Sequence, residues 1–267
     1  MVHIPQFFNA GSTDEGGGSL PPITADLLWQ FDASTNANLY SNAGTTKVLS
    51  GGTVQQFNSS IGSRFAQQDT ASERPEWYST GGQNGKGYLE FGAVFNEWLY
   101  MAWESAFSSQ NYSNYMVVEA TGTNSGEVYP FYGFIGDDVS TGIGLYFRSS
   151  SNQYEMSATD WNFDFVNNSD YADNTVQIFS FRATNGGGSA SLKLLVNDGT
   201  ETSTDGSTTF DFGTTDPLVI LGACNQSGDD VRHINMKFYE WLSYDTLHSD
   251  AERNQVMTYL NDKYNIY

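Results

Sequence analysis

INMKFYEWLSYDTLHSDAERNQVMTYLNDKY, residues 234–264, changes its hydrophobic period midway, which predicts a strand followed by a helix. Residues 234–244 have the apolar and aromatic content of a strand. Ser249 and Glu252 then stand at capping-box spacing, so Ser249 is expected to begin the helix and Glu252 to occupy its third position. One apolar face follows at Val256, Leu260 and Tyr264, with Lys263 near the helix end, where a cation is favourable. We therefore expect one short C-terminal helix lying on a β-structure.

Upstream of this stretch, strand signals repeat along the chain. They occupy residues 27–33, 87–92, 115–120, 128–136, 142–148, 176–183, 191–197 and 217–222. Turn signals such as NGKG, NGGG and NDGT separate them. Aromatic residues make up 15% of the chain, and rings favour the pleated, half-buried surface of a sheet. This pattern, without an internal repeat, predicts an all-β sandwich or barrel.

The C-terminal motif resembles the end of concanavalin A-like lectin/glucanase (LamG-like) domains. The matching residues are Leu247, Asp250, Ala251, Glu252, Arg253, Val256, Tyr259 and Leu260, with His248 inserted before Ser249. Weaker matches lie at 28–33, 54–57, Arg74-Pro75 and Asn84-Gly85. The resemblance implies a concanavalin A-like antiparallel β-sandwich, or jelly roll, with one C-terminal helix. Such domains occur in secreted bacterial proteins and in virion structural proteins of tailed phages.

The N-terminal segment differs in composition from the rest of the chain. Residues 11–22, GSTDEGGGSLPP, predict a flexible arm closed by two prolines, so we divide the chain into an arm, 1–22, and a sandwich domain, 23–267. Ile4, Phe7 and Phe8 form an apolar cluster before the glycines. We expect these three residues to dock on a partner or on a neighbouring copy in a homo-oligomer. The alternative is a disordered leader.

Charge excludes one large class of partner. The chain has 31 acidic and 11 basic residues, a net charge of −20. Nucleic-acid binding needs Lys and Arg to displace counterions, and anionic membranes would repel this chain. The start of the sequence has no secretory signal pattern, and no run reaches transmembrane length. We therefore expect synthesis in a cytoplasm and a final location in a virion, with an extracellular location as the alternative.

Catalytic motifs are absent from the sequence. Glucanases that share the resembled fold carry E-x-D-x-E on one strand, and no such pattern occurs. Glu240 and Asp245 are five residues apart and would face opposite sides of a strand, so Glu240 is interpreted as a structural acid. Cys224 lies in an apolar run and is expected to be a buried small residue. The chain is predicted not to be an enzyme, and to require no cofactor.

Calcium is considered because two acidic pairs fall in turns. Asp137 and Asp138 follow one predicted strand, and Asp229 and Asp230 follow a QSG turn. Carboxylates in loops at one end of a jelly roll could supply oxygen ligands to Ca²⁺. The alternative is two solvated acidic turns.

Carbohydrate binding would use aromatic rings with polar neighbours. Trp161 with Asp160, in a loop-like stretch, and Tyr112, in NYSNY, are the candidates for ligand contact. Trp98 and Trp103 are further candidates, and ordinary core packing is the alternative for all of these rings.

Three functions remain open from the sequence. The first is a non-enzymatic virion structural protein, such as a capsid decoration, fibre or knob component of a tailed phage. In it the arm docks to other virion proteins and the exposed sandwich aids attachment to a host-surface glycan. The second is a carbohydrate-binding lectin-like module, with or without calcium, and the third is a glucanase-type glycoside hydrolase.

Overall fold

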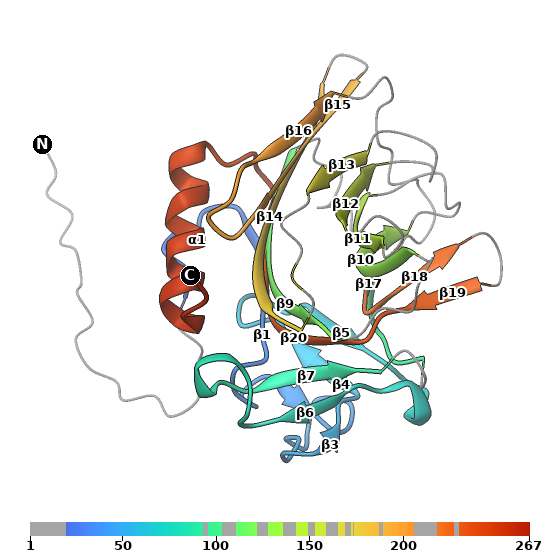
Figure 1. Cartoon of the computed structure of the whole chain (residues 1–267). Coiled ribbons are helices and arrows are strands. Elements are labelled where there is room, and N and C mark those ends of the chain that lie inside the picture. The colour runs from blue at the N-terminus through green and yellow to red at the C-terminus, as the bar shows by residue number, and fades with distance from the viewer. Residues whose placement is uncertain are drawn as a thin grey trace, which may run out of the picture.

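The computed structural model is an antiparallel β-sandwich with one C-terminal helix, as the sequence predicts (Figure 1). It describes residues 20–92, 96–102, 111–121, 128–135, 143–148, 153–158, 165–168, 172, 174–186, 189–205, 218–226 and 230–267. The predicted arm residues Ile4, Phe7 and Phe8 lie outside this range. Within it, no helix is long and apolar enough to cross a membrane.

Sheet A lies beneath the helix. Its strands, in spatial order, are β16 (Thr202–Asp205), β15 (Ser189–Val196), β14 (Val176–Gly186), β9 (Asn111–Ala120), β20 (Met236–Tyr244), β7 (Tyr88–Phe91), β6 (Glu76–Tyr78) and β3 (Gly52–Thr53). β1 (Leu27–Asp32) also pairs with β20. β9 runs along one edge of β20, whereas β7 and then β1 share the other edge. The strand predicted at 234–244 is therefore central to the sheet.

Sheet B forms the second layer. Its order is β13 (Phe165–Asn168), β12 (Gln153–Ala158), β11 (Ile143–Arg148), β10 (Val128–Ile135), β17 (Leu218–Leu221), β8 (Leu99–Ala102), β5 (Phe65–Gln67), β4 (Gln56–Asn58) and β2 (Leu39–Tyr40). A separate hairpin joins β18 (Ala223–Gln226) to β19 (Asp230–His233). Two short 3₁₀ helices, η1 (Ala71–Glu73) and η2 (Gln83–Gly85), lie in the connections. All nine strands predicted from the sequence are present.

Strand β9 is buried on both faces. Met116 and Val118 point into the core between the sheets, whereas Tyr115 and Val117 join the cluster beneath the helix. Successive side chains of a strand point to opposite faces, so two separate apolar layers produce the nearly continuous apolar run of β9.

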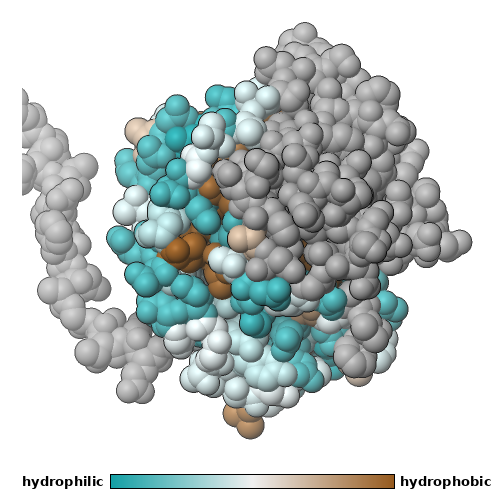
Figure 2. Space-filling view, viewed as in Figure 1, coloured by the Kyte–Doolittle hydropathy of each residue, from teal (hydrophilic) through white to brown (hydrophobic). Residues whose placement is uncertain are grey.

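Helix α1 (Asp250–Tyr264) begins as predicted. The Ser249 side chain accepts a hydrogen bond from the Glu252 amide at 3.3 Å, and the Glu252 carboxylate accepts one from the Ser249 amide at 2.8 Å. Its apolar face, Val256, Met257, Leu260 and Tyr264, is buried against sheet A. The helix lies along the outer surface of β14 and β9 (Figure 1), and its surroundings are largely hydrophilic on the face shown in Figure 2.

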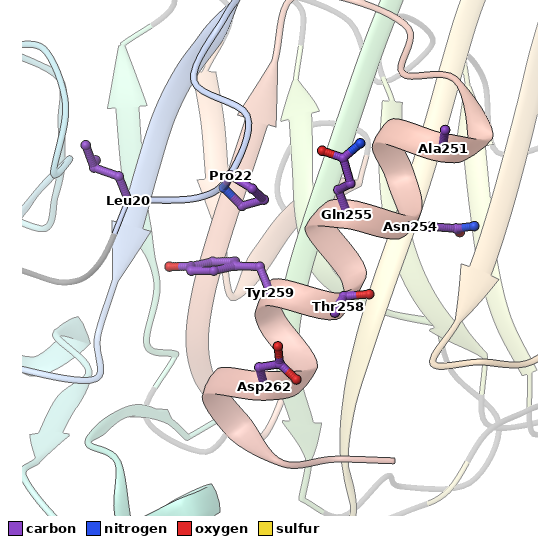
Figure 3. Close-up of a pocket in the computed structure, with 8 residues that line it drawn as sticks. All are labelled: Leu20, Pro22, Ala251, Asn254, Gln255, Thr258, Tyr259 and Asp262. Atoms are coloured by element: carbon purple, nitrogen blue, oxygen red, sulfur yellow. The ribbon is translucent and has the colours of Figure 1, made fainter. Parts of the chain in front are cut away.

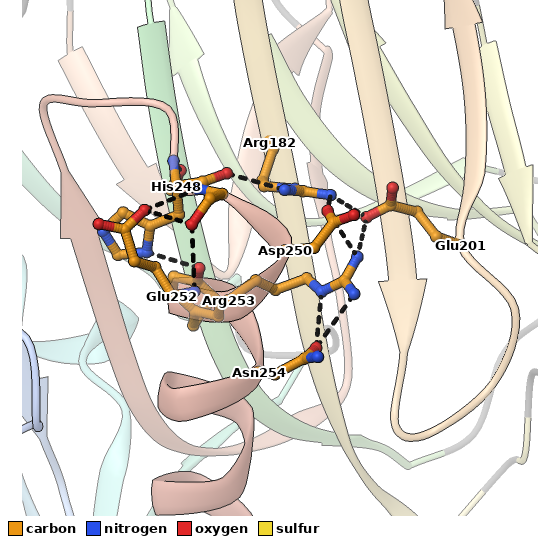
Figure 4. Close-up of polar contacts among 10 residues, drawn as sticks. Arg182, Glu201, His248, Asp250, Glu252, Arg253 and Asn254 are labelled. Atoms are coloured by element: carbon orange, nitrogen blue, oxygen red, sulfur yellow. Dashed lines mark hydrogen bonds and ion pairs between the residues drawn. The ribbon is translucent and has the colours of Figure 1, made fainter.

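Charged groups fasten the start of the helix to β14. Arg182, only 3% exposed, donates to the His248 carbonyl at 2.8 Å and pairs with Glu201 at 2.5 Å and Asp250 at 2.7 Å (Figure 4). Arg253 joins the same Glu201 carboxylate at 2.5 Å. The arginine is therefore compensated by two acids and a carbonyl, as a buried charge requires.

Candidate functional site

The outer surface of sheet B carries a row of polar and aromatic side chains. Tyr40, Gln56, Gln67 and Tyr100 are direct cross-strand partners on β2, β4, β5 and β8. Each is half-buried. Their neighbours Leu39, Phe57, Ala66 and Leu99 are buried in the core between the sheets, so the four residues point to the outside. We call this set the amide–tyrosine row.

Hydrogen bonds hold the row in place. The Gln67 amide donates to the Tyr100 hydroxyl at 3.0 Å, and that hydroxyl donates to the Asp69 carboxylate at 3.1 Å. The Gln56 amide donates to the Asn58 side chain at 2.6 Å. Each amide is thus oriented through its nitrogen, and among the described residues no hydrogen bond is recorded to either side-chain oxygen. Those oxygens are available to accept from a ligand.

Further rings and charges flank the row. The Trp98 ring lies 5.4 Å from the Tyr100 ring, and its indole N–H donates to Glu73 at 3.1 Å. At the other end, the Lys47 ammonium lies 3.8 Å over the Tyr40 ring, a cation–π contact. Trp98, one of the rings named from the sequence, is half-buried here.

This arrangement suits a neutral polyhydroxylated ligand. An aromatic ring presents an apolar face with a polar tip, which suits the carbon-bound hydrogens of a sugar ring. A side-chain amide offers donors and acceptors together, which suits hydroxyl groups that do the same. A few oriented polar groups among rings are the usual content of a ligand site.

Glu97, the residue next to Trp98, has an unusually high pKa for a carboxyl group. Burial raises the pKa of its carboxyl to about 7, and the nearby Glu76 and Glu90 carboxylates add to the shift. A hydrogen bond from the Gly92 amide, at 2.6 Å, opposes it. Glu97 therefore changes charge near neutral pH.

Glu240, the acid weighed for hydrolysis, is fully buried. Its carboxylate accepts from Gln30 at 2.8 Å, Lys263 at 2.7 Å and Tyr264 at 3.0 Å. Burial is the largest cause of its raised pKa. These contacts fit the structural role expected from the sequence and leave no opening for a glycosidic bond.

Lys263 lies in the last turn of α1, as the sequence predicts. Its ammonium also lies 2.6 Å from Asp32 and 2.7 Å from Glu240. Both acids are buried in the sheet, so the lysine serves a buried charge cluster.

Tyr112 is corrected by the structure. Its ring is fully buried in the core between the sheets, and burial raises the pKa of its hydroxyl. A ring without exposed surface cannot stack on a sugar, so Tyr112 is a core residue.

Most other predicted site residues are not placed by the structure. Trp161, Asp160, Trp103, Asp137, Asp138 and Asp229 lie outside the described residues. Asp230 begins β19, and Cys224 lies in β18, but neither side chain is described. Among the described residues, no group of three or more His, Cys, Asp or Glu side chains could hold a metal ion. Calcium at the four aspartates stays a prediction.

Comparison with known proteins establishes the fold. No family model matches the sequence, and neither does any curated protein. A sialidase of Trypanosoma rangeli in complex with sialic acid is similar in structure, with 12% identity over 90% of this chain and 34% of that chain, at a TM-score of 0.57. The shared feature is the β-sandwich.

A second group of similar structures is the binding domain of botulinum neurotoxin DC. The complex with rat synaptotagmin II has 9% identity over 88% of this chain and 52% of that chain, at a TM-score of 0.51. The complex with SialylT has 10% identity over 89% and 52%, at a TM-score of 0.50. This chain thus spans about a third of the sialidase and about half of the toxin domain.

Proposed function

We propose that this chain is a non-catalytic carbohydrate-binding module whose site is the amide–tyrosine row. The observation that carries the proposal is the alignment of Tyr40, Gln56, Gln67 and Tyr100 across four strands of sheet B. Two of the similar structures are complexes with sialic acid and with SialylT, which supports a sugar as the ligand.

The ligand is proposed to be a neutral glycan. Asp69 and Glu73 contact the Tyr100 and Trp98 side chains, so two carboxylates flank the row. The whole chain adds a net charge of −20. An anionic sugar would be repelled by this field, whereas neutral hydroxyl groups can donate to the acids.

The absence of catalysis is part of the proposal. Glu240 is supported as a structural acid by its complete burial and its four hydrogen-bond partners. Virion location, homo-oligomerisation and arm docking remain predictions from the sequence. A glycan-binding face would serve a virion component in attachment as well as an extracellular lectin.

Binding of the full chain to an array of neutral and sialylated glycans tests this function. We expect neutral glycans to bind, and Gln67→Ala to weaken binding about tenfold, because a lost hydrogen bond costs on the order of 1 kcal/mol or more. Gln255→Ala is the matched control, since Gln255 is exposed on α1 rather than on sheet B. No binding to any glycan, or unchanged binding by Gln67→Ala, would exclude the site.

A further inference from the structure

A groove runs between the first described residues and the outward side of α1. Its volume is about 510 Å³, and most of its lining is apolar surface. Figure 3 shows its walls, which are Leu20, Pro22, Ala251, Asn254, Gln255, Thr258, Tyr259 and Asp262. The helix residues recur at three- and four-residue spacing, so they form one continuous stripe. Apart from Tyr259, which also packs against the cluster buried on sheet A, the stripe lies beside the buried face of the helix.

Both walls of the groove are held by contacts to the sandwich. The Tyr259 hydroxyl donates to Glu240 at 3.3 Å, which fixes the ring at the groove wall. On the other side, the Tyr244 hydroxyl donates to the Ile23 carbonyl at 3.0 Å, and Pro21 is buried. The groove is therefore preformed, as small binding grooves usually are.

Leu20 is an apolar residue that the groove leaves largely exposed. It lines the groove and is 56% exposed, although burial of a leucine side chain is favourable. It is also the point where the Gly-rich N-terminal segment joins the described structure. A group that buried the Leu20 side chain would therefore lie next to the end of the N-terminal segment.

The length of the segment matches the groove. Eleven residues separate Phe8 from Leu20, and a Gly-rich chain of that length has a root-mean-square span of roughly 18 Å. The helix stripe from Ala251 to Asp262 is about 17 Å long at 1.5 Å per residue. Because Leu20 itself lines the groove, a segment with this span can reach any part of the stripe, and a short tether gives its tip a high effective concentration there.

We propose that the apolar tip of the N-terminal segment, Ile4, Phe7 and Phe8, docks in this groove of its own chain. The occupant supplies two phenylalanine rings and an isoleucine, and the groove supplies Leu20, Pro22 and the Tyr259 ring as apolar contacts. The linker favours the same chain over a second copy, because tethering replaces a bimolecular encounter. The proposal is independent of glycan binding, which lies on sheet B.

Photo-crosslinking of the full chain tests the docking. Phe8 is replaced by p-benzoylphenylalanine, the protein is irradiated at low concentration, and the crosslinked peptides are identified by mass spectrometry. We expect a crosslink to the peptide that contains residues 251–262, in material that migrates as a monomer. Crosslinks between two chains would replace the proposal with arm exchange. Crosslinks elsewhere, or none, would refute docking in the groove.

A blocking variant supplies the control. Thr258→Trp fills the groove and should lower the crosslink yield about tenfold, since a lost contact of 1.4 kcal/mol has that effect. Thr80→Trp places the same ring on another exposed threonine, outside the groove, and should leave the yield unchanged. If Thr258→Trp lowers the melting temperature, Asn254→Trp replaces it. Equal yields in blocked and control proteins would overturn the proposal.

Discussion

The Lys263 ammonium lies 2.7 Å from the Glu240 carboxylate, joining the C-terminal helix to the central strand β20. The same ammonium lies 2.6 Å from Asp32 on β1. Lys263 is 9% exposed, and the two acids are almost fully buried. One cation thus compensates two buried acids, one from the first strand and one from the last. Loss of this single ammonium would leave both carboxylates without a compensating charge.

Lys263→Met is expected to destabilise the protein by about 3–5 kcal/mol at pH 7, because it leaves two buried carboxylates without a compensating positive charge. Burial already raises the pKa of Glu240, and losing the ammonium raises it further. A raised folded-state pKa disfavours folding as pH rises above 4.5, the ordinary pKa of a glutamate, so the deficit in unfolding free energy should shrink near pH 4.5. Urea unfolding of variant and wild type at both pH values measures this.

Lys86→Met serves as the control for that comparison, because Lys86 lies in a loop and forms no ion pair with the residues that the structure describes. A deficit for Lys263→Met of equal size at pH 4.5 and pH 7 would show that its cause is lost packing instead of an uncompensated charge.

Glu97→Gln is expected to flatten the pH dependence of stability. Burial raises the folded-state pKa of Glu97 to about 7, from the ordinary glutamate value of 4.5. The wild type therefore loses stability as pH rises from 4.5 through 7, because a buried charge forms. The glutamine stays neutral, so it should raise the melting temperature more at pH 8 than at pH 5. A parallel shift at both pH values would contradict the raised pKa.

Long strands and the helix could be predicted from the sequence because their patterns are strong. The segment 234–264 contains both a two-residue and a four-residue period, and the capping box at Ser249 marks the change. The nine predicted strands include all the long strands of sheet A. Local patterns of this kind are fixed by neighbouring residues, so they survive without tertiary information.

The amide–tyrosine row was not predictable in the same way. It lies on strands of two to four residues, such as β2 and β5, which are too short for a recognisable alternation. Gln56 and Gln67 become neighbours only through strand pairing. Trp98 was the one residue at this site that the sequence pointed to, because aromatic rings with polar neighbours are a feature of sugar-binding sites. Tyr112 was predicted to contact a ligand but is buried, because a tyrosine-rich stretch does not show which of its rings face the core.

Tyr100→Phe should reduce glycan affinity roughly three- to tenfold while changing stability little. The hydroxyl accepts from Gln67 and donates to Asp69, so its removal frees the amide that it orients. The ring remains half-buried, which limits the cost to folding. Affinity is measured by calorimetry and stability by thermal unfolding. Tyr78→Phe, on sheet A, is the control and should bind normally; a loss of affinity there would move the site.

His248 should make the protein less stable at mildly acidic pH. Its imidazole is 2% exposed, its Nδ1 lies 2.7 Å from the Tyr115 hydroxyl, and burial is the largest cause of its lowered pKa, with Arg182 adding to it. A histidine whose folded-state pKa lies below 6.5, the ordinary value of the unfolded chain, favours folding above that pH and loses this contribution as pH falls. Unfolding free energy should therefore decrease between pH 7.5 and 5.5.

His248→Phe isolates that effect. It should cost about 1–3 kcal/mol at pH 7.5, because the buried Tyr115 hydroxyl loses its partner. The loss between pH 7.5 and 5.5 should then be smaller than in the wild type, since phenylalanine takes up no proton. His233, whose pKa is also lowered by burial, is present in both proteins and cancels in the difference. If both proteins lose the same stability over this range, His248 is not the group that titrates.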